Sequence, residues 1–162
     1  INIKKDDNDK ISSSELKKLI EMGEIITVNK NLSKDYFIQG KIIEGKKLGR
    51  ELGYPTANLD YSKEIVIPKD GIYKTNSIFR SKKFLSITSI GNNPTFNEKI
   101  KTIETYIIDF NKNIYGENLK IIFKDYIRGQ IKFENKKDLI TQMDKDLKKV
   151  SEENWKWNLL MS

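Results

Sequence analysis

The chain has 162 residues and contains neither cysteine nor histidine. Without cysteine there can be no disulfide bond, no thiolate metal site and no thiol nucleophile. Without histidine, the side chain that most often serves as a general base or a transition-metal ligand near neutral pH is missing. Any catalysis must therefore rely on carboxylates, hydroxyls, lysine, arginine, backbone amides or a hard cation held by oxygen atoms.

Long apolar runs are also missing. No stretch approaches the roughly 18 apolar residues of a membrane-spanning helix, and the start of the chain does not resemble a signal peptide. We therefore expect a cytoplasmic monomer with no membrane partner, built as one domain with short appendages. Because the chain begins with Ile1 rather than methionine, we expect a trimmed product or a fragment.

Arginine is scarce, although the formal net charge is +7. A basic chain raises the question of a nucleic-acid ligand. The positive charges are almost all lysines, spread along the chain among acidic residues, and arginine occurs only at Arg50, Arg80 and Arg128. A high content of lysine, asparagine and isoleucine is also what an AT-rich genome produces. Nucleic-acid binding is therefore kept as an alternative and is not the favoured interpretation.

A short helix is expected near the start of the chain. Ser12 and Glu15 have the spacing of a capping box, apolar residues follow at helical spacing, and Gly23 is a suitable end. These signals predict a helix over about 12–22. Residues 29–35 are expected to form a polar connector.

The middle of the chain is strand-like. Short runs rich in β-forming residues are expected to be strands: 36–43, 64–67, 72–79, 83–90, 102–110 and 119–128. The third and fourth are expected to form one hairpin around residues 80–82, and the fifth and sixth another through residues 111–116. Six or so short strands with no helix between them predict an antiparallel sheet closed into a small barrel.

The helical period returns after Phe133. Asn135 can cap a helix, and Ser151 could cap a final turn that carries Trp155 and Trp157. The apolar side chains between these two caps lie on one stripe, which predicts an amphipathic helix packed across the barrel: Leu139, Ile140, Met143, Leu147 and Val150.

Three glycines, Gly45, Gly49 and Gly53, lie four residues apart directly after the first expected strand. Glycine permits positive φ and close backbone approach, and successive free amides in such a loop can bind phosphates. Lys47 and Arg50 add positive charge. The segment is not a Walker loop, because no Gly-Lys-Ser/Thr follows, and it is not a Rossmann fingerprint, because no helix follows. A phosphate-binding loop and a mobile basic hairpin loop both remain open at this point.

The next residues favour the first interpretation. Pro55 fixes its own φ and biases Tyr54 toward an extended conformation. In an extended stretch Thr56 and Asn58 point to the same side, separated by the small Ala57. A hydroxyl and an amide oxygen on one face suit Mg²⁺, although threonine and asparagine also commonly make turn hydrogen bonds.

Residues 45–59, with the run Gly-Tyr-Pro-Thr-Ala-Asn, resemble the flap and nucleotide motif of riboflavin kinases. The resemblance covers roughly residues 36–150. It implies a six-stranded antiparallel closed β-barrel with a C-terminal helix, which agrees with the strand and helix patterns above. Further blocks follow in the family's order: 70–73, 89–96, 104–110, 115–116, 127–128 and 132–133.

The resemblance implies transfer of the γ-phosphoryl group of ATP to the 5′-hydroxyl of riboflavin, which gives FMN and ADP. Thr56 and Asn58 would hold Mg²⁺, and Glu104 matches the family's catalytic glutamate. Glu104 could instead be a surface glutamate on the polar face of a strand. Residues from the glycine segment and from the flavin end would bind the two substrates: Gly45, Lys47, Gly49, Arg50, Gly53, Pro55, Thr56, Asn58, Arg128 and Phe133.

The flavin end departs from the family at Gly129-Gln130, where relatives usually include an acidic residue. Leu139 and Met143 lie near this end, but their helical spacing favours a plain core role. Residues 11–35 resemble the tail of the adenylyltransferase domain of bacterial bifunctional FAD synthetases. That domain's core needs histidines, so this chain alone should not make FAD. We therefore expect residues 1–35 to be a remnant or stump of that domain, and residues 36–162 to be the kinase.

Two alternatives remain. One is a barrel that binds single-stranded nucleic acid through exposed aromatic rings on a basic strand face. The other is an inactive homologue that only binds flavin. The first alternative needs exposed rings, for which the candidates are Tyr36, Phe37, Tyr73, Phe79 and Phe84.

Overall fold

The computed structural model describes residues 11–45, 48–95 and 98–161. Within these residues six antiparallel strands close into a barrel in the order β1-β2-β5-β4-β3-β6, so the predicted fold class is confirmed. The strands are β1 (Phe37–Ile43), β2 (Ala57–Asp60), β3 (Gly71–Phe79), β4 (Lys82–Thr95), β5 (Glu98–Ile107) and β6 (Asn118–Arg128). The helices are α1 (Ser13–Glu21), α2 (Ile25–Asn31), α3 (Leu48–Glu51) and α4 (Lys136–Met161).

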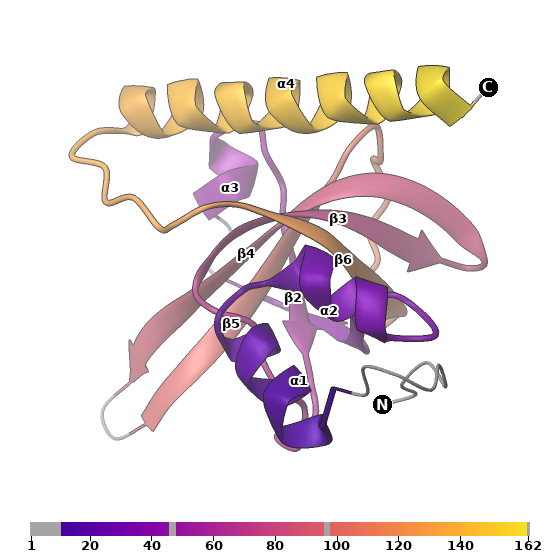
Figure 1. Ribbon diagram of the computed structural model, residues 1–162. Coiled ribbons are helices and arrows are strands. Elements are labelled where there is room, and N and C mark those ends of the chain that lie inside the picture. The colour runs from indigo at the N-terminus through magenta and orange to yellow at the C-terminus, as the bar shows by residue number, and fades with distance from the viewer. Residues whose placement is uncertain (1–10, 46–47, 96–97, 162) are drawn as a thin grey trace.

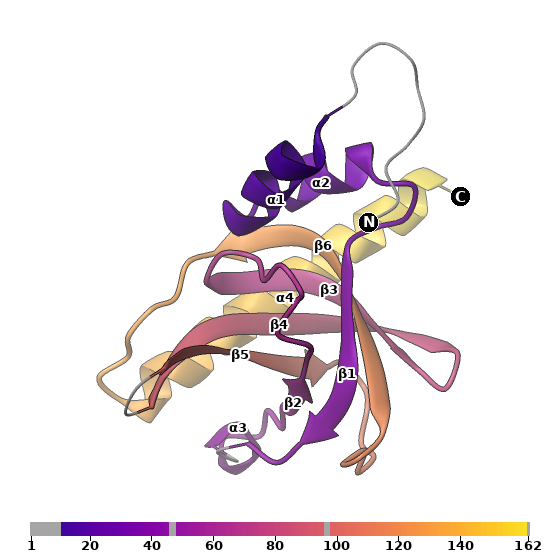
Figure 2. The ribbon, with the colours of Figure 1, turned by 90° about the horizontal axis from the view of Figure 1, so that it is seen from below.

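The helices lie on different parts of the barrel surface. Figures 1 and 2 show α4 running across one side of the barrel, while α1 and α2 lie together elsewhere on its surface, near β6. The short α3 lies in the connection between β1 and β2. No helix in the part of the chain that the structure describes is long and apolar enough to cross a membrane.

The barrel interior combines apolar side chains with a chain of hydroxyls. Five fully buried hydroxyl groups, from β3, β4 and β5, are joined by hydrogen bonds of 2.8 Å each. Buried polar groups need such partners because an unpaired one is costly. The bonds link the three strands side by side, which fixes their register. In order along the chain of bonds, the groups are Thr105, Thr88, Thr75, Ser86 and Ser77.

The hairpin of β3 and β4 forms as predicted. Arg80 and Ser81 occupy its two-residue turn with φ of 46° and 64°. Positive φ at both central residues is the type I′ geometry that matches the twist of the flanking strands.

The predicted hairpin of residues 102–110 and 119–128 is wrong. β5 pairs with β2 and β4, whereas β6 pairs with β1 and β3. Closing the barrel requires β6 to bridge β1 and β3, so the two strands that are neighbours in the sequence are separated in space. This long-range pairing leaves no signal in the local pattern.

The predicted strand at 64–67 is also wrong. These residues belong to a connection, and their apolar side chains Ile65, Val66 and Ile67 pack against the core from outside the sheet. The strand in this part of the chain is β2, which includes the Ala57-Asn58 pair and bonds to β1 and β5.

The predicted helix at 12–22 is confirmed as α1, with its capping box. The Ser12 amide donates to Glu15 Oε2 at 2.8 Å, and the Glu15 amide donates to Ser12 Oγ at 3.2 Å. These hydrogen bonds lower the pKa of the exposed Glu15 carboxyl. Gly23 follows the helix with φ of 78°, as its role of helix stop requires.

A second helix, α2, was not predicted, and it occupies part of the expected 29–35 connector. Its sequence has no side-chain cap and contains β-branched residues, so local signals for a helix are weak. The helix is stabilised by burial of Ile25 and Val28, which join Leu16 and Ile20 of α1 in the same apolar core as the barrel. Whether residues 1–35 derive from another domain stays a prediction.

The C-terminal helix begins as expected, since Asn135 Oδ1 accepts the Asp138 amide at 2.9 Å. The prediction of a new cap at Ser151 is wrong, because α4 continues without interruption to Met161. The side chains of Trp155 and Trp157 lie outside the described residues.

Candidate functional site

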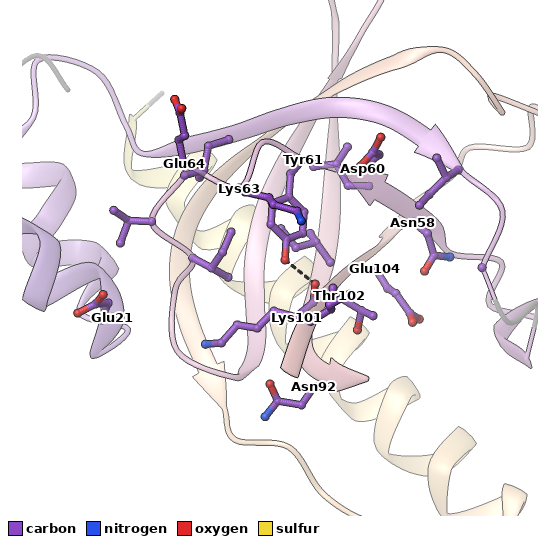
Figure 3. Close-up of a pocket in the computed structure, with 18 of the residues that line it drawn as sticks. Glu21, Asn58, Asp60, Tyr61, Lys63, Glu64, Asn92, Lys101, Thr102 and Glu104 are labelled. Carbon is purple, nitrogen blue, oxygen red and sulfur yellow. Dashed lines mark hydrogen bonds between the residues drawn. The ribbon is translucent and has the colours of Figure 1, made fainter. Parts of the chain in front are cut away.

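Two cavities lie on the outer surface of the barrel. The first, which we name the loop cavity, has a volume of about 1420 Å³ and lies between α1, segment 61–67 and the outer faces of β2 and β5 (Figure 3). The second, the helix cavity, has a volume of about 390 Å³ and lies between the barrel and α4. The two cavities share one side chain, Glu104.

Strand pairing places Glu104 at the centre of a row of polar side chains. Glu104 on β5 lies opposite Asn58 on β2 and opposite Ser89 on β4. Figure 3 shows Asn58 and Glu104 on the same side of the loop cavity, with Thr102 beside Glu104. Directly paired residues have Cβ atoms about 4.5–5.5 Å apart, so all three polar groups are within reach of one ligand.

The predicted site residues divide between these cavities. Lys47 lies outside the described residues, and Arg50, Gly53 and Pro55 are exposed. Gly45 and Asn58 line the loop cavity. The remaining predicted binding residues line the helix cavity: Gly49, Thr56, Arg128 and Phe133.

Gly45 is packed against the side chain of Asn58. A Cβ at this position would lie 1.9 Å from Asn58 Nδ2 and 2.6 Å from Oδ1. Atoms cannot approach so closely, so a larger residue would displace the amide. Gly45 is thus needed for the position of Asn58. The third glycine, Gly53, has φ of 84°, which favours glycine for conformational reasons.

The segment between these glycines contains the short helix α3, which was not predicted. Tyr54, just after it, packs edge-on against Tyr106 with ring centroids 5.3 Å apart and an interplanar angle of 77°. The Tyr54 hydroxyl donates to Asp144 on α4. The glycine segment is therefore tied both to β5 and to the C-terminal helix, and it forms one wall of the helix cavity.

Arg128 forms a second tie between the barrel and α4. Its Nε lies 3.0 and 3.1 Å from the two carboxylate oxygens of Asp146, and its NH2 group lies 2.6 Å from Oδ2. Asp146 is 6% exposed and also accepts from Gln142 Nε2 at 3.0 Å. In this structure the Arg128 guanidinium therefore holds α4 against the barrel at the edge of the helix cavity.

The walls of the helix cavity are mostly apolar near α4. Leu139 and Met143 were expected to be plain core, but both are half-buried and line this cavity, as does Phe133. Sequence reasoning placed Gln130 at the flavin end without giving it a role, and it missed Ser89 as a lining residue. Ser89 falls within one of the blocks that resemble the family, but its orientation depends on the barrel.

The residues expected to hold Mg²⁺ offer suitable oxygen atoms. The side chains of Thr56, Asn58 and Glu104 make no hydrogen bond to another described residue, so their oxygens are available. No group of three or more acidic side chains comes together in the described residues to form an all-protein cage. Mg²⁺ commonly takes one or two protein ligands and completes its shell with water and phosphate oxygens, which fits this donor set.

The nucleic-acid alternative needs exposed aromatic rings, and the structure buries several of them. Tyr36, Tyr73 and Phe79 are 7%, 0% and 6% exposed. Burial raises the pKa of the Tyr36 and Tyr73 hydroxyls well above the ordinary value. These three rings face the protein core and present no stacking face to a base.

The closed six-stranded barrel with a helix across one side defines the class of fold. A riboflavin kinase structure from Trypanosoma brucei aligns with a TM-score of 0.52 at 22% identity, over 72% of this chain and 78% of that chain. The chain belongs to the riboflavin kinase family, because residues 32–153 match the family model described as flavokinase, riboflavin kinase.

Two further comparisons show how much of longer proteins the chain matches. A bifunctional riboflavin kinase/FMN adenylyltransferase from Listeria monocytogenes is 38% identical over 140 residues, which are 86% of this chain and 45% of that protein. A crystal structure described as a macrolide-efflux protein from Streptococcus pneumoniae aligns with a TM-score of 0.83 and 32% identity, over 91% of this chain and 49% of that chain. The chain thus spans about half the length of these relatives and is homologous to the kinase part of the bifunctional enzyme.

Proposed function

We propose that the chain is an active riboflavin kinase, which transfers the γ-phosphoryl group of ATP to the 5′-hydroxyl of riboflavin and releases FMN and ADP. The observation that carries this proposal is the position of Glu104, which lines both cavities. A phosphate bound on one side of Glu104 and a hydroxyl bound on the other side would meet at this carboxylate.

Riboflavin is proposed to occupy the helix cavity. Its volume of about 390 Å³ lies within the range of roughly 300–1,000 Å³ that is typical of small-molecule sites. The apolar side chains of Ile72, Ile87, Phe133 and Leu139 suit a flat aromatic ring system. Glu104 and Ser89, on the barrel wall, suit the polar chain that carries the reacting hydroxyl.

The phosphates of ATP are proposed to bind beside the glycine segment, where Gly45 lets Asn58 approach the backbone closely. Thr56 and Asn58 would hold Mg²⁺, which supplies neutralisation of the phosphate charge. Phosphoryl transfer asks the protein mainly for positioning and charge stabilisation. Glu104 would orient the 5′-hydroxyl and accept its proton, a contribution that is modest when the transition state is loose.

The test is a direct assay of the described reaction. The protein is incubated with riboflavin, ATP and MgCl₂, and FMN is measured by chromatography, with parallel reactions that lack ATP or contain EDTA. We expect FMN only in the complete mixture. The absence of FMN with Mg²⁺, Mn²⁺ or Zn²⁺ would refute the enzyme and leave an inactive flavin-binding homologue. Salt-dependent binding to oligonucleotides would instead favour the nucleic-acid alternative.

A further inference from the structure

Gln130, at the position where the sequence departs from its relatives, has a defined orientation in the structure. Its Nε2 atom lies 2.7 Å from the backbone oxygen of Ile90 and 2.9 Å from Ser89 Oγ. A backbone carbonyl can only accept a hydrogen bond, so the atom beside it must be the amide nitrogen. Both amide hydrogens are thus used within the protein, and Oε1 remains as an acceptor at the edge of the helix cavity.

The same contact orients Ser89. Because Ser89 Oγ accepts a hydrogen from Gln130, the serine's own hydrogen is left to donate. Ser89 lies directly opposite Glu104 in the pairing of β4 with β5, and all three side chains line the helix cavity. One wall therefore offers a free acceptor, a free donor and a carboxylate in a row.

This row matches a chain of alcohol groups. A hydroxyl both donates and accepts, so it can use the Gln130 oxygen and the Ser89 hydrogen together. If the proposed function holds and the 5′-hydroxyl lies at Glu104, the secondary hydroxyls of the ribityl chain occupy the next carbons along.

We propose that Gln130 and Ser89 form a polyol subsite, which recognises the secondary hydroxyls of the ribityl chain and thereby selects riboflavin over flavins with a plain alkyl chain. A site built to hydrogen-bond a substrate hydroxyl discriminates strongly against an analogue that lacks it, because the polar groups of the site are left unpaired. An acidic residue at position 130 could not replace the glutamine here, since a carboxylate cannot donate to the Ile90 oxygen.

The test compares riboflavin with 7,8-dimethyl-10-(5-hydroxypentyl)isoalloxazine, which keeps the terminal hydroxyl and lacks the three secondary ones. We measure kcat/KM for both substrates in the wild type, Gln130→Met and Ser89→Ala. Each substitution should lower kcat/KM for riboflavin about tenfold, which corresponds to the free energy of about one hydrogen bond. The kcat/KM for the pentyl analogue should change less than about twofold. Gln39→Met, at an exposed position on β1, is the matched control and should change neither value.

The outcomes separate this inference from the proposed function. Equal losses on both substrates would show that Gln130 only holds the loop in place, and would overturn the polyol subsite. Wild-type activity with no preference for riboflavin would overturn it as well. If the wild type phosphorylates neither substrate, the proposed function fails first. If Gln130→Met does not fold, Ser89→Ala keeps the loop sequence intact, and its kcat/KM values for the two substrates then decide whether the polyol subsite exists.

Discussion

The contact between Gly45 and Asn58 allows a sharp test of the proposed metal site. In Gly45→Ala the new methyl group would lie 1.9 Å from Asn58 Nδ2, so the amide must move by more than 1 Å to reach the ordinary contact distance of about 3.4 Å or more. Gly45 does not have a positive φ, so alanine introduces no backbone strain there. The amide is the end of a flexible side chain, and it can move without unfolding the strand.

We therefore expect a folded protein with an impaired site. A displacement of about 1 Å at a substrate-positioning group can lower activity about 100-fold. The kcat/KM for ATP should fall by about this factor, and more Mg²⁺ should be needed for half-maximal activity. The urea midpoint should remain close to that of the wild type, which separates this effect from a loss of stability.

A double-mutant cycle provides the control. Asn58→Ala removes the side chain that the methyl group displaces, so adding Gly45→Ala to Asn58→Ala should cost little further activity. The reasoning is wrong if Gly45→Ala retains wild-type activity and Mg²⁺ dependence. It is also wrong if the two substitutions reduce activity independently, because the loss would then not arise from displacement of the amide.

Three other predictions follow from the geometry. Glu104→Gln should lower kcat less than removal of Mg²⁺ by EDTA, and a larger loss would contradict the positioning role. Asp146→Ala should lower the free energy of unfolding in urea by about 3 kcal/mol, because the largely buried Arg128 loses its partner. Glu117→Ala, which breaks the exposed pair with Arg80, should lower it by less than about 1 kcal/mol, and equal losses would contradict this reasoning. Burial raises the pKa of the Tyr36 hydroxyl, so above about pH 10 the unfolded state loses this proton before the folded state does, and the free energy of unfolding falls as the pH rises. In Tyr36→Phe the free energy of unfolding should fall less steeply with pH. Parallel pH profiles for the two proteins would exclude this cause.

The parts of the fold that depend on local signals were predictable. The capping box at Ser12 and Glu15 and the cap at Asn135 follow from the side chains' own hydrogen bonds to nearby backbone. The hairpin around residues 80–82 follows from two strand-like runs separated by a short polar break. The strand pattern predicted the barrel, and the family resemblance agreed with it and supplied the candidate glutamate. These features need no knowledge of distant strands.

The parts that failed depend on tertiary contacts. The apolar run 64–67 has the composition of a strand, but its side chains cover the core from a loop, while β2 forms from residues of the Pro-Thr-Ala-Asn block. The helix cavity is formed by the glycine segment, four strands and α4 together. Ser89 faces this cavity because of the register of β4, and it meets Gln130 because of the path of the chain after β6.

The packing of α1 and α2 has a consequence for how this chain can be divided. A cut at residue 36, where the barrel strands begin, would remove Leu16, Ile20, Ile25 and Val28, which are at most 1% exposed and contact the same core as Ile38. The smallest unit that folds is therefore larger than the set of strands that forms the cavity walls. Any transfer of this barrel into another protein should include both helices, since their apolar side chains complete its core.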